Sequence, residues 1–132
     1  MREMDLRFVE NVPPDLIAAL RESVGWPRME KACRDDTLQN FFELGCYDGQ
    51  RLIGYVCVVS NRVTDAYIQD LMVAPDYQGH GIGSELVRLC MNECPSSEWL
   101  LETIPERVSF YEKLGFSQFT QPVMQIPCKW FK

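Results

Sequence analysis

The chain has 132 residues, of which 46% are hydrophobic and 24% are charged, and its formal net charge is −6. This composition is that of a single globular domain with a sizeable core, and it excludes disordered and fibrous proteins. An acidic chain repels nucleic acid and anionic membranes, so neither is expected as a partner. The simplest interpretation of the charge is solubility, with a weak preference for cationic substrates as the alternative.

The amino-terminal stretch MREMDLRFVENVPPD has no apolar run of the signal-peptide type, and no segment approaches the roughly 20 apolar residues of a membrane-spanning helix. No CxxC pair occurs, and the single histidine, His80, is not next to a cysteine in the sequence. We therefore predict a cytoplasmic protein without a bound metal, in which most cysteines pack as small core residues. The six are Cys33, Cys46, Cys57, Cys90, Cys94 and Cys128.

The first third of the chain predicts one strand and two helices. Residues 5–10 alternate weakly and indicate the strand. The first helix starts at Asn11 or Asp15 and ends at Gly25, with one apolar face formed by Leu16, Ile17, Leu20 and Val24. A second, weaker helix is predicted over Met29–Asn40.

Three apolar runs in the middle of the chain predict an antiparallel meander. Residues 41–47 and 51–60 are rich in strand-forming side chains, and Asp48-Gly49-Gln50 separates them as a hairpin turn. A third strand is predicted over 63–73, after a turn at Asn61-Arg62.

The last third begins with a glycine-rich loop and a helix from Ile82 that Pro95 ends. A short strand follows at 99–101. Thr103 and Glu106 fit a capping box for a helix that Gly115 stops. Residues 116–120 and 123–131 are predicted as last strands. The element order is then β-α-α-β-β-β-α-β-α-β, which indicates a mixed α/β fold with helices packed on a central sheet.

The loop QGHGIG, residues 78–83, places three glycines between a strand and a helix. It lacks the Gly-Lys-Ser/Thr of a P-loop, and its GxGxG spacing differs from the GxGxxG of a dinucleotide site. Successive backbone N–H groups at a helix N-terminus nevertheless attract phosphate, and glycine lets a ligand approach them. A tight turn with three positive φ angles is the structural alternative.

Two stretches together resemble a known family. DLMVAPDYQGHGIG, residues 70–83, resembles the acetyl-CoA-binding motif of the GNAT N-acetyltransferase superfamily, in which a strand leads into Q/R-x-x-G-x-G/A and a helix. FYEKLGF, residues 110–116, resembles a second motif of that family at the expected distance downstream. The resemblance implies one N-acetyltransferase domain over residues 1–132, built on a mixed, mostly antiparallel sheet with helices on both faces.

The resemblance also implies how acetyl-CoA binds. Backbone N–H groups of the loop would hold the pyrophosphate, with a side-chain contact from His80. Pantetheine would pair with the backbone of the preceding strand, where that strand separates from the strand containing Trp99. The cofactor-binding residues implied in this way are Leu71, Met72, Val73, Gln78, Gly79, His80, Gly81, Ile82, Gly83, Ser84 and Tyr111.

Acetyl transfer to an amine requires a neutral amine, a stabilised oxyanion and a protonated leaving thiolate. By resemblance, Tyr111 is the general acid; its alternative is ordinary packing on a helical face with Val108 and Leu114. The family's usual glutamate position holds Tyr67, so we predict Asp70 as a base that acts through water, with local pairing at a strand end as its alternative. Asp65 and Glu102 are further candidates. Ile104 stands where relatives have a pantetheine-binding asparagine.

The sequence is less specific about the acceptor. Trp26 lies in the region expected to form the acceptor site, where it either lines the pocket or covers the core. The leading hypothesis is an N-acetyltransferase for a primary amine of a small cationic molecule. The rivals are transfer to a protein lysine or N-terminal amine, and a non-catalytic acyl-CoA-binding module. A homodimer is expected by analogy alone.

Overall fold

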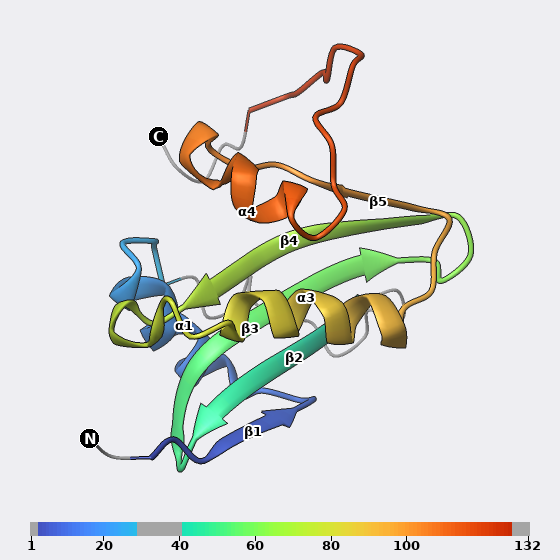
Figure 1. Ribbon diagram of the computed structural model, residues 1–132. Coiled ribbons are helices and arrows are strands. Elements are labelled where there is room, and N and C mark those ends of the chain that lie inside the picture. Colours follow the sequence, from blue (N-terminus) through green and yellow to red (C-terminus); the bar gives the residue numbers. More distant parts are fainter. Residues whose placement is uncertain (1–2, 29–40, 128–132) are drawn as a thin grey trace. The chain divides into compact units, whose positions relative to one another are not determined.

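A five-stranded sheet with the order β1-β2-β3-β4-β5 organises the first part of the chain (Figure 1). The computed structural model describes residues 3–28 and 41–127, which belong to two compact units, Met1–Glu102 and Thr103–Lys132. All neighbouring strands of the sheet are antiparallel except β4 and β5, which run parallel. The strands are β1 Leu6–Val9, β2 Phe41–Asp48, β3 Arg51–Ser60, β4 Asp65–Val73 and β5 Glu98–Leu101.

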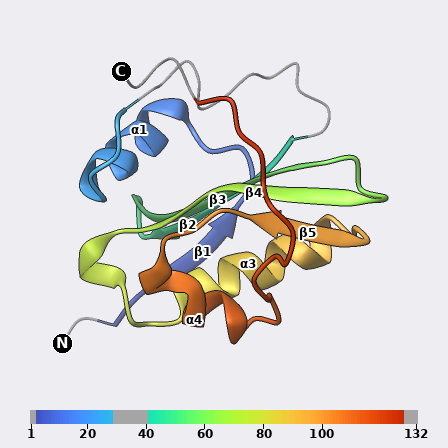
Figure 2. The same cartoon turned by 90° about the horizontal axis from the view of Figure 1, so that it is seen from above.

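Two helices of the first unit cover opposite faces of this sheet, as Figure 2 shows. Helix α1, Pro14–Ser23, packs on β3 and β4, whereas α3, Ile82–Glu93, packs on β2, β3 and β4. Because both faces are covered, β2 and β3 are buried along almost their whole length, which explains their nearly continuous apolar sequences. The predicted meander and the helices on both faces are confirmed.

Gly54 in β3 lets α3 approach the sheet closely. A Cβ atom at this position would lie 3.1 Å from a methyl carbon of Ile82 and 3.1 Å from one of Leu86. Both residues belong to the first turns of α3, so this contact fixes the N-terminal end of the helix against the middle of the sheet. The glycine loop that precedes α3 is thereby held at the end of β4.

Strand β4 changes its pairing near its middle. It pairs with β5 from Asp65 to Ile68 and continues to Val73, five residues beyond the last pair. On its other side a β-bulge leaves Gln69 out of register, since Val58 pairs with Ile68 and Cys57 pairs with Asp70. A bulge bends and twists a strand locally, so it accounts for the separation of β4 from β5 at this point.

The second unit begins with a 3₁₀ turn, Pro105–Arg107, and a short helix, α4 Val108–Glu112. The predicted capping box is wrong, because Ile104 caps the 3₁₀ turn and no side-chain hydrogen bond from Thr103 is made. Pro105 is the first residue of this turn, and its ring fixes its own φ angle at a helical value. The turn therefore forms without a side-chain cap. Gly115, with φ of 100°, follows α4 as predicted.

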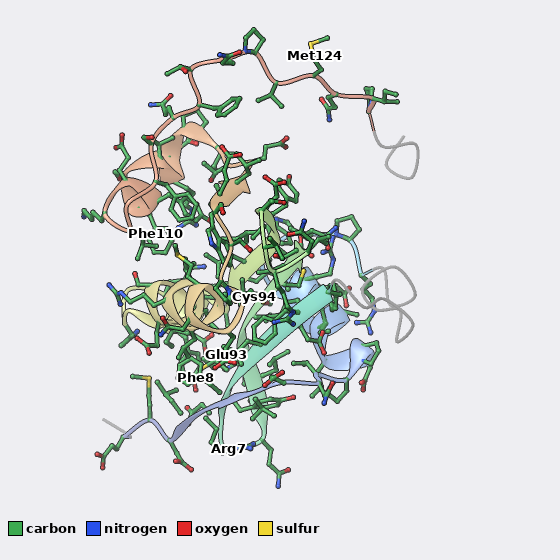
Figure 3. All side chains as sticks on the ribbon, turned by 90° about the vertical axis from the view of Figure 1, so that its right-hand side faces the viewer. Arg7, Phe8, Glu93, Cys94, Phe110 and Met124 are labelled. Carbon is green, nitrogen blue, oxygen red and sulfur yellow. The ribbon has the colours of Figure 1, made fainter. Side chains whose placement is uncertain are left out.

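The two predicted last strands are also wrong over residues 116–120 and 123–127, which contain no regular secondary structure. Pro122 and Pro127 each lack a backbone N–H group for a β-ladder. The side chains of Met124 and Ile126 are both 89% exposed, so no second layer covers this segment within the described residues. In Figure 3, Met124 lies on the extended segment, away from Phe110 of α4.

The cysteines that the structure describes are found in the core. The cysteines within the described ranges, Cys46, Cys57, Cys90 and Cys94, are buried and form no disulfide, as predicted for core residues. Over the same ranges no helix is both long enough and apolar enough to cross a bilayer, and no three metal-ligating side chains come together. The helix predicted over Met29–Asn40 lies outside the described residues.

Candidate active site

The glycine loop connects β4 to α3 through a 3₁₀ turn, η1 Pro75–Tyr77. Gly79 and Gly81 adopt φ angles of 82° and 80°, in the left-handed region that L side chains rarely occupy. A Cβ atom at either position would meet no atom within 4 Å. The positive φ angles alone therefore account for glycine here, and the space in front of the loop is open.

The loop ends at the N-terminus of α3. Gly81 is the N-cap residue, and no side chain caps the helix there. The first N–H groups of a helix have no partner inside it, so those of Ile82, Gly83 and Ser84 are available for an anion. The sequence alternative, a tight turn with three positive φ angles, is wrong in its number. Only Gly79 and Gly81 of the loop have positive φ angles, because Gly83 is part of α3. This end of the 12-residue helix has the features of a phosphate site.

Two polar side chains of the loop bind to the protein backbone. The Gln78 side-chain amide donates a hydrogen bond to the Val73 carbonyl at 2.9 Å. The His80 ring is within hydrogen-bonding distance of the carbonyls of Tyr77 and Gln78, at 3.1 and 3.2 Å, so Nδ1 is the donor. Both side chains stabilise the shape of the loop, which leaves backbone groups as its main donors.

The end of β4 supplies a backbone edge next to the loop. Leu71, Met72 and Val73 pair with β3 on one side, whereas the β5 ladder stops at Ile68 on the other side. Met72 is buried, so its side chain belongs to the core and only its backbone can serve a ligand. An unpaired strand edge suits a peptide-like ligand that offers complementary hydrogen bonds.

Asp70 immediately follows the bulge and is held by two neighbours on the α1 face. Its carboxylate accepts a hydrogen bond from Arg21 Nη1 at 3.1 Å and a weak one from the Cys57 thiol at 3.8 Å. Burial raises the pKa of Asp70, whereas the charge of Arg21 and the two hydrogen bonds oppose that rise. The same burial raises the pKa of Cys57 well above its ordinary value, so this thiol stays protonated and is not a nucleophile.

Tyr111 lies in the second unit, on α4. Its ring makes edge-to-face contacts with Phe110 and Phe116, with ring centroids 5.0 and 5.8 Å apart. Its carbonyl accepts hydrogen bonds from the N–H groups of Leu114 and Phe116. Burial raises the pKa of the phenol, with Arg107 opposing the rise, so Tyr111 is protonated at neutral pH and can donate a proton.

Other candidates from the sequence are less well placed. Asp65 is exposed at the opposite end of β4 from the glycine loop, and Glu102 is exposed beyond β5. Tyr67 is 41% exposed on β4, where burial and nearby carboxylates raise its pKa. Within the first unit, the structure thus brings together the loop, the free edge of β4 and Asp70.

Arg21 is the residue that the sequence reasoning missed. It follows Ile17 by four residues and so lies on the buried face of α1. A charged residue on an apolar helical face needs a partner, and this departure from the pattern was the signal available in the sequence. Its partner, Asp70, is 49 residues away, which no local pattern discloses.

The profile of the Acetyltransferase (GNAT) family matches residues 6–116, which are most of the chain and include the first part of the second unit. The chain belongs to the GNAT acetyltransferase family. The match covers the glycine loop and the FYEKLGF motif, on which the predicted resemblance depended.

Individual GNAT relatives agree with this assignment. A Porphyra purpurea protein named "Uncharacterized N-acetyltransferase ycf52" is 33% identical over 124 residues, which are 88% of this chain and 71% of that protein. A Glycine max protein named "Histone acetyltransferase TAP1" is 28% identical, over 76% of this chain and 50% of its own length. A GNAT family structure from Streptococcus pneumoniae covers 96% of this chain and 99% of its own, with a TM-score of 0.79 and 23% identity, and supports the fold.

Membership in the GNAT family implies acetyl-CoA as the co-substrate, and the residues present suit it. The loop offers open space before two left-handed glycines, and α3 offers an N-terminus without a side-chain cap. The strand edge beside them begins at the point where β5 ends. A diphosphate linked to an extended amide-containing arm has the chemistry that these two features recognise together.

Proposed function

We propose that this GNAT protein is an acetyl-CoA-dependent N-acetyltransferase that acts on a primary amine by direct transfer in a ternary complex. One observation carries the proposal: an edge of β4 that has no strand partner among the described residues leads, through one 3₁₀ turn, into a glycine loop and a helix N-terminus without a side-chain cap. Bound acetyl-CoA supplies an acyl thioester. The remaining chemistry belongs to the chain's own residues.

Backbone groups provide most of the proposed binding. The N–H groups of the loop and of the first turn of α3 bind the pyrophosphate, over the residues Gln78, Gly79, His80, Gly81, Ile82, Gly83 and Ser84. The backbone of Leu71, Met72 and Val73 pairs with the pantetheine amides. His80 acts mainly by holding the loop, because its ring already bonds to two carbonyls of the loop.

The proposed reaction forms one C–N bond and breaks one C–S bond. An ammonium acceptor loses two protons overall, of which one returns to the leaving thiolate and the other goes to solvent. Asp70 takes the outgoing proton, through water, and Tyr111 supplies the proton that the thiolate needs. The raised pKa of Tyr111 keeps it protonated as a donor, and Asp70 is the carboxylate within β4 that is closer in sequence to the end of the strand.

For the acceptor, we propose a small cationic amine, in accord with the net charge of −6. Transfer to a protein is the second candidate, because the Glycine max relative is named a histone acetyltransferase. Trp26 lies beside Arg21 on the α1 side of β4. It would border the acceptor amine, whether that amine belongs to a small molecule or to a protein.

The test has two stages. Thermal shift and calorimetry with acetyl-CoA, with free adenosine as the matched control ligand, measure binding. Release of CoA thiol is then followed with a panel of small amines, with a lysine-containing histone-tail peptide and with a peptide bearing a free N-terminus. We expect stabilisation by acetyl-CoA and CoA release with small amines.

The outcomes separate the candidates. Absence of stabilisation by acetyl-CoA would overturn the whole proposal. Stabilisation without acetylation of any amine or peptide would favour a non-catalytic acyl-CoA-binding module. Turnover confined to the peptides would replace the small-molecule acceptor with a protein.

A further inference from the structure

Arg21 is a buried guanidinium, and its contacts within the described residues include a carbonyl, a carboxylate and an aromatic ring. Its Nε atom donates a hydrogen bond to the Pro27 carbonyl at 2.6 Å, and Nη1 donates to Asp70 Oδ2 at 3.1 Å. The guanidinium carbon also lies 5.3 Å from the centre of the Trp26 ring. An arginine held by a carbonyl, a carboxylate and an aromatic face has little rotational freedom.

The end of α1 creates these contacts. Gly25 has a φ angle of 86°, and its N–H donates to the Glu22 carbonyl, while the Trp26 N–H donates to the Arg21 carbonyl. This pair of bonds is a Schellman motif, which reverses the chain after a helix. The reversal returns Trp26 and Pro27 to the side chain of Arg21. The sequence after α1 therefore surrounds a guanidinium that points toward β4.

The two members of the ion pair differ in exposure. The Arg21 side chain is 10% exposed and that of Asp70 is 28% exposed, so the carboxylate is the accessible member. Arg21 lies behind it as a fixed positive charge. Asp70 itself lies where β4 has lost its β5 partner, which is the edge proposed to hold pantetheine.

The charges around Asp70 come from a small number of elements. Within the described residues, Arg21 faces it from α1, the Cys57 thiol faces it from β3, and Tyr67 interacts with it from β4 itself. Glu43 on β2 acts on Cys57 rather than on Asp70. Burial raises the pKa of Asp70, and Arg21 is the largest influence that opposes burial.

We propose that Arg21 is a positioning residue, which holds the Asp70 carboxylate ionised and oriented at the free edge of β4 so that it can accept the proton of the acceptor amine. This inference rests on the proposed function. The same contacts serve the fold, since the pair connects α1 to the sheet, but a purely structural connection would not change the pH dependence of catalysis.

The test uses kcat/KM for the best amine of the panel between pH 4 and 9, at saturating acetyl-CoA. In Arg21→Gln, the acidic limb should move upward by about one pH unit, because a carboxylate loses an opposite charge at close range. Arg21→Lys, which restores a positive charge, should recover most of this change. Arg28→Gln removes the exposed pair between Arg28 and Glu22 in the same segment and should leave the limb in place.

A second measurement needs no acceptor. The Asp70 carboxylate is titrated by carbon-13 NMR in the wild type and in Arg21→Gln, with Asp70→Asn to assign its signal, and its pKa should rise in the variant. An unchanged pKa would overturn the inference, as would an unmoved acidic limb or an Asp70→Asn enzyme with the wild-type rate and pH profile. Failure of the proposed function would show instead as a wild-type protein that releases no CoA thiol with any amine or peptide.

Discussion

The phenol of Tyr77 donates a hydrogen bond to the carboxylate of Asp48, which is 29 residues earlier in the chain. Both side chains are buried, and Asp48 also accepts a hydrogen bond from the Asp5 backbone N–H at 3.0 Å. Tyr77 is the last residue of the 3₁₀ turn before the glycine loop, and Asp48 is the last residue of β2. The β2–β3 hairpin therefore holds the start of the loop.

Tyr77→Phe should destabilise the protein and weaken acetyl-CoA binding. The change leaves a buried carboxylate without one partner, which costs about 1 to 3 kcal/mol. We expect a lower free energy of unfolding in urea and a several-fold higher Kd for acetyl-CoA by calorimetry.

Arg51→Gln is the matched control for Tyr77→Phe. It breaks a pair between the same hairpin and Asp76 of the same turn, with distances of 2.8 and 3.1 Å, whose side chains are both more than half exposed. It also removes the guanidinium that lies 5.3 Å from the centre of the Tyr77 ring, but it keeps the buried hydrogen bond from Tyr77 to Asp48. Exposed pairs contribute little, so stability and Kd should both stay close to the wild type. Equal effects of the two variants would contradict the assigned role of the buried hydrogen bond.

Gly81→Ala should weaken acetyl-CoA binding well beyond its effect on stability. Its φ angle of 80° makes any L side chain costly, by about 1 to 2 kcal/mol, and the new methyl group would occupy the open space before the α3 N-terminus. Gly49→Ala is the control, since Gly49 has a φ angle of 62° and open space in the β2–β3 turn. Calorimetry should give an increase in Kd of about tenfold or more for Gly81→Ala and almost none for Gly49→Ala. A similar Kd in both variants would remove the loop from the binding site.

The sequence predicted the parts of this fold that follow local patterns. The bounds of β3 and the start of α3 agree with prediction, because hydrophobic periodicity and turn residues determine them. The β-bulge at Gln69 has no comparable sequence pattern, since it depends on the register between β3 and β4. It is nevertheless the feature that frees the edge of β4.

The capping box and the last strands were predicted wrongly because a proline opposes the local sequence pattern in both places. Thr103 and Glu106 have capping-box spacing, but Pro105 begins a 3₁₀ turn between them. The apolar residues Val123 and Ile126 favoured a strand, yet flanking prolines remove donors and no neighbouring strand pairs with this segment in the described residues. In the site, motif spacing identified the loop, whereas the pairing of Arg21 with Asp70 is a tertiary contact.

Tyr111→Phe should lower kcat while leaving the Kd for acetyl-CoA nearly unchanged. The ring contacts with Phe110 and Phe116 survive the change, so the fold is retained and only the phenol O–H is lost. Loss of a general acid costs about 100-fold or more in rate. Because burial raises the pKa of Tyr111 above its ordinary value of 10.0, the midpoint of any activity loss caused by its deprotonation should lie above pH 10.

Steady-state rates and calorimetry on the same preparation of Tyr111→Phe make this comparison, with Phe110→Leu as a packing control. An unchanged kcat in Tyr111→Phe would exclude Tyr111 as the proton donor. If Phe110→Leu lowers kcat while Tyr111→Phe keeps the wild-type kcat, the FYEKLGF motif has a structural role instead.

Asp70 should make the stability of the protein depend on pH in a characteristic direction. Its pKa is raised in the folded state, so the unfolded chain releases this proton at lower pH than the folded chain does. The free energy of unfolding contributed by Asp70 therefore falls as pH rises from about 4 through the folded-state pKa, and is constant above it. Each unit by which the pKa is raised corresponds to about 1.4 kcal/mol.

Urea unfolding of the wild type and Asp70→Asn between pH 4 and 7 measures this contribution. In the variant, the Asp70 carboxylate is absent from Arg21 at every pH. The free energy lost in this way is independent of pH, so it does not change how the difference in unfolding free energy between the two proteins depends on pH. We expect the wild type to lose stability relative to the variant as pH rises across this window. A wild type that instead gains stability relative to the variant as pH rises would contradict this expectation. It would mean that Arg21 outweighs burial and lowers the pKa of Asp70, which would make the carboxylate a weaker base.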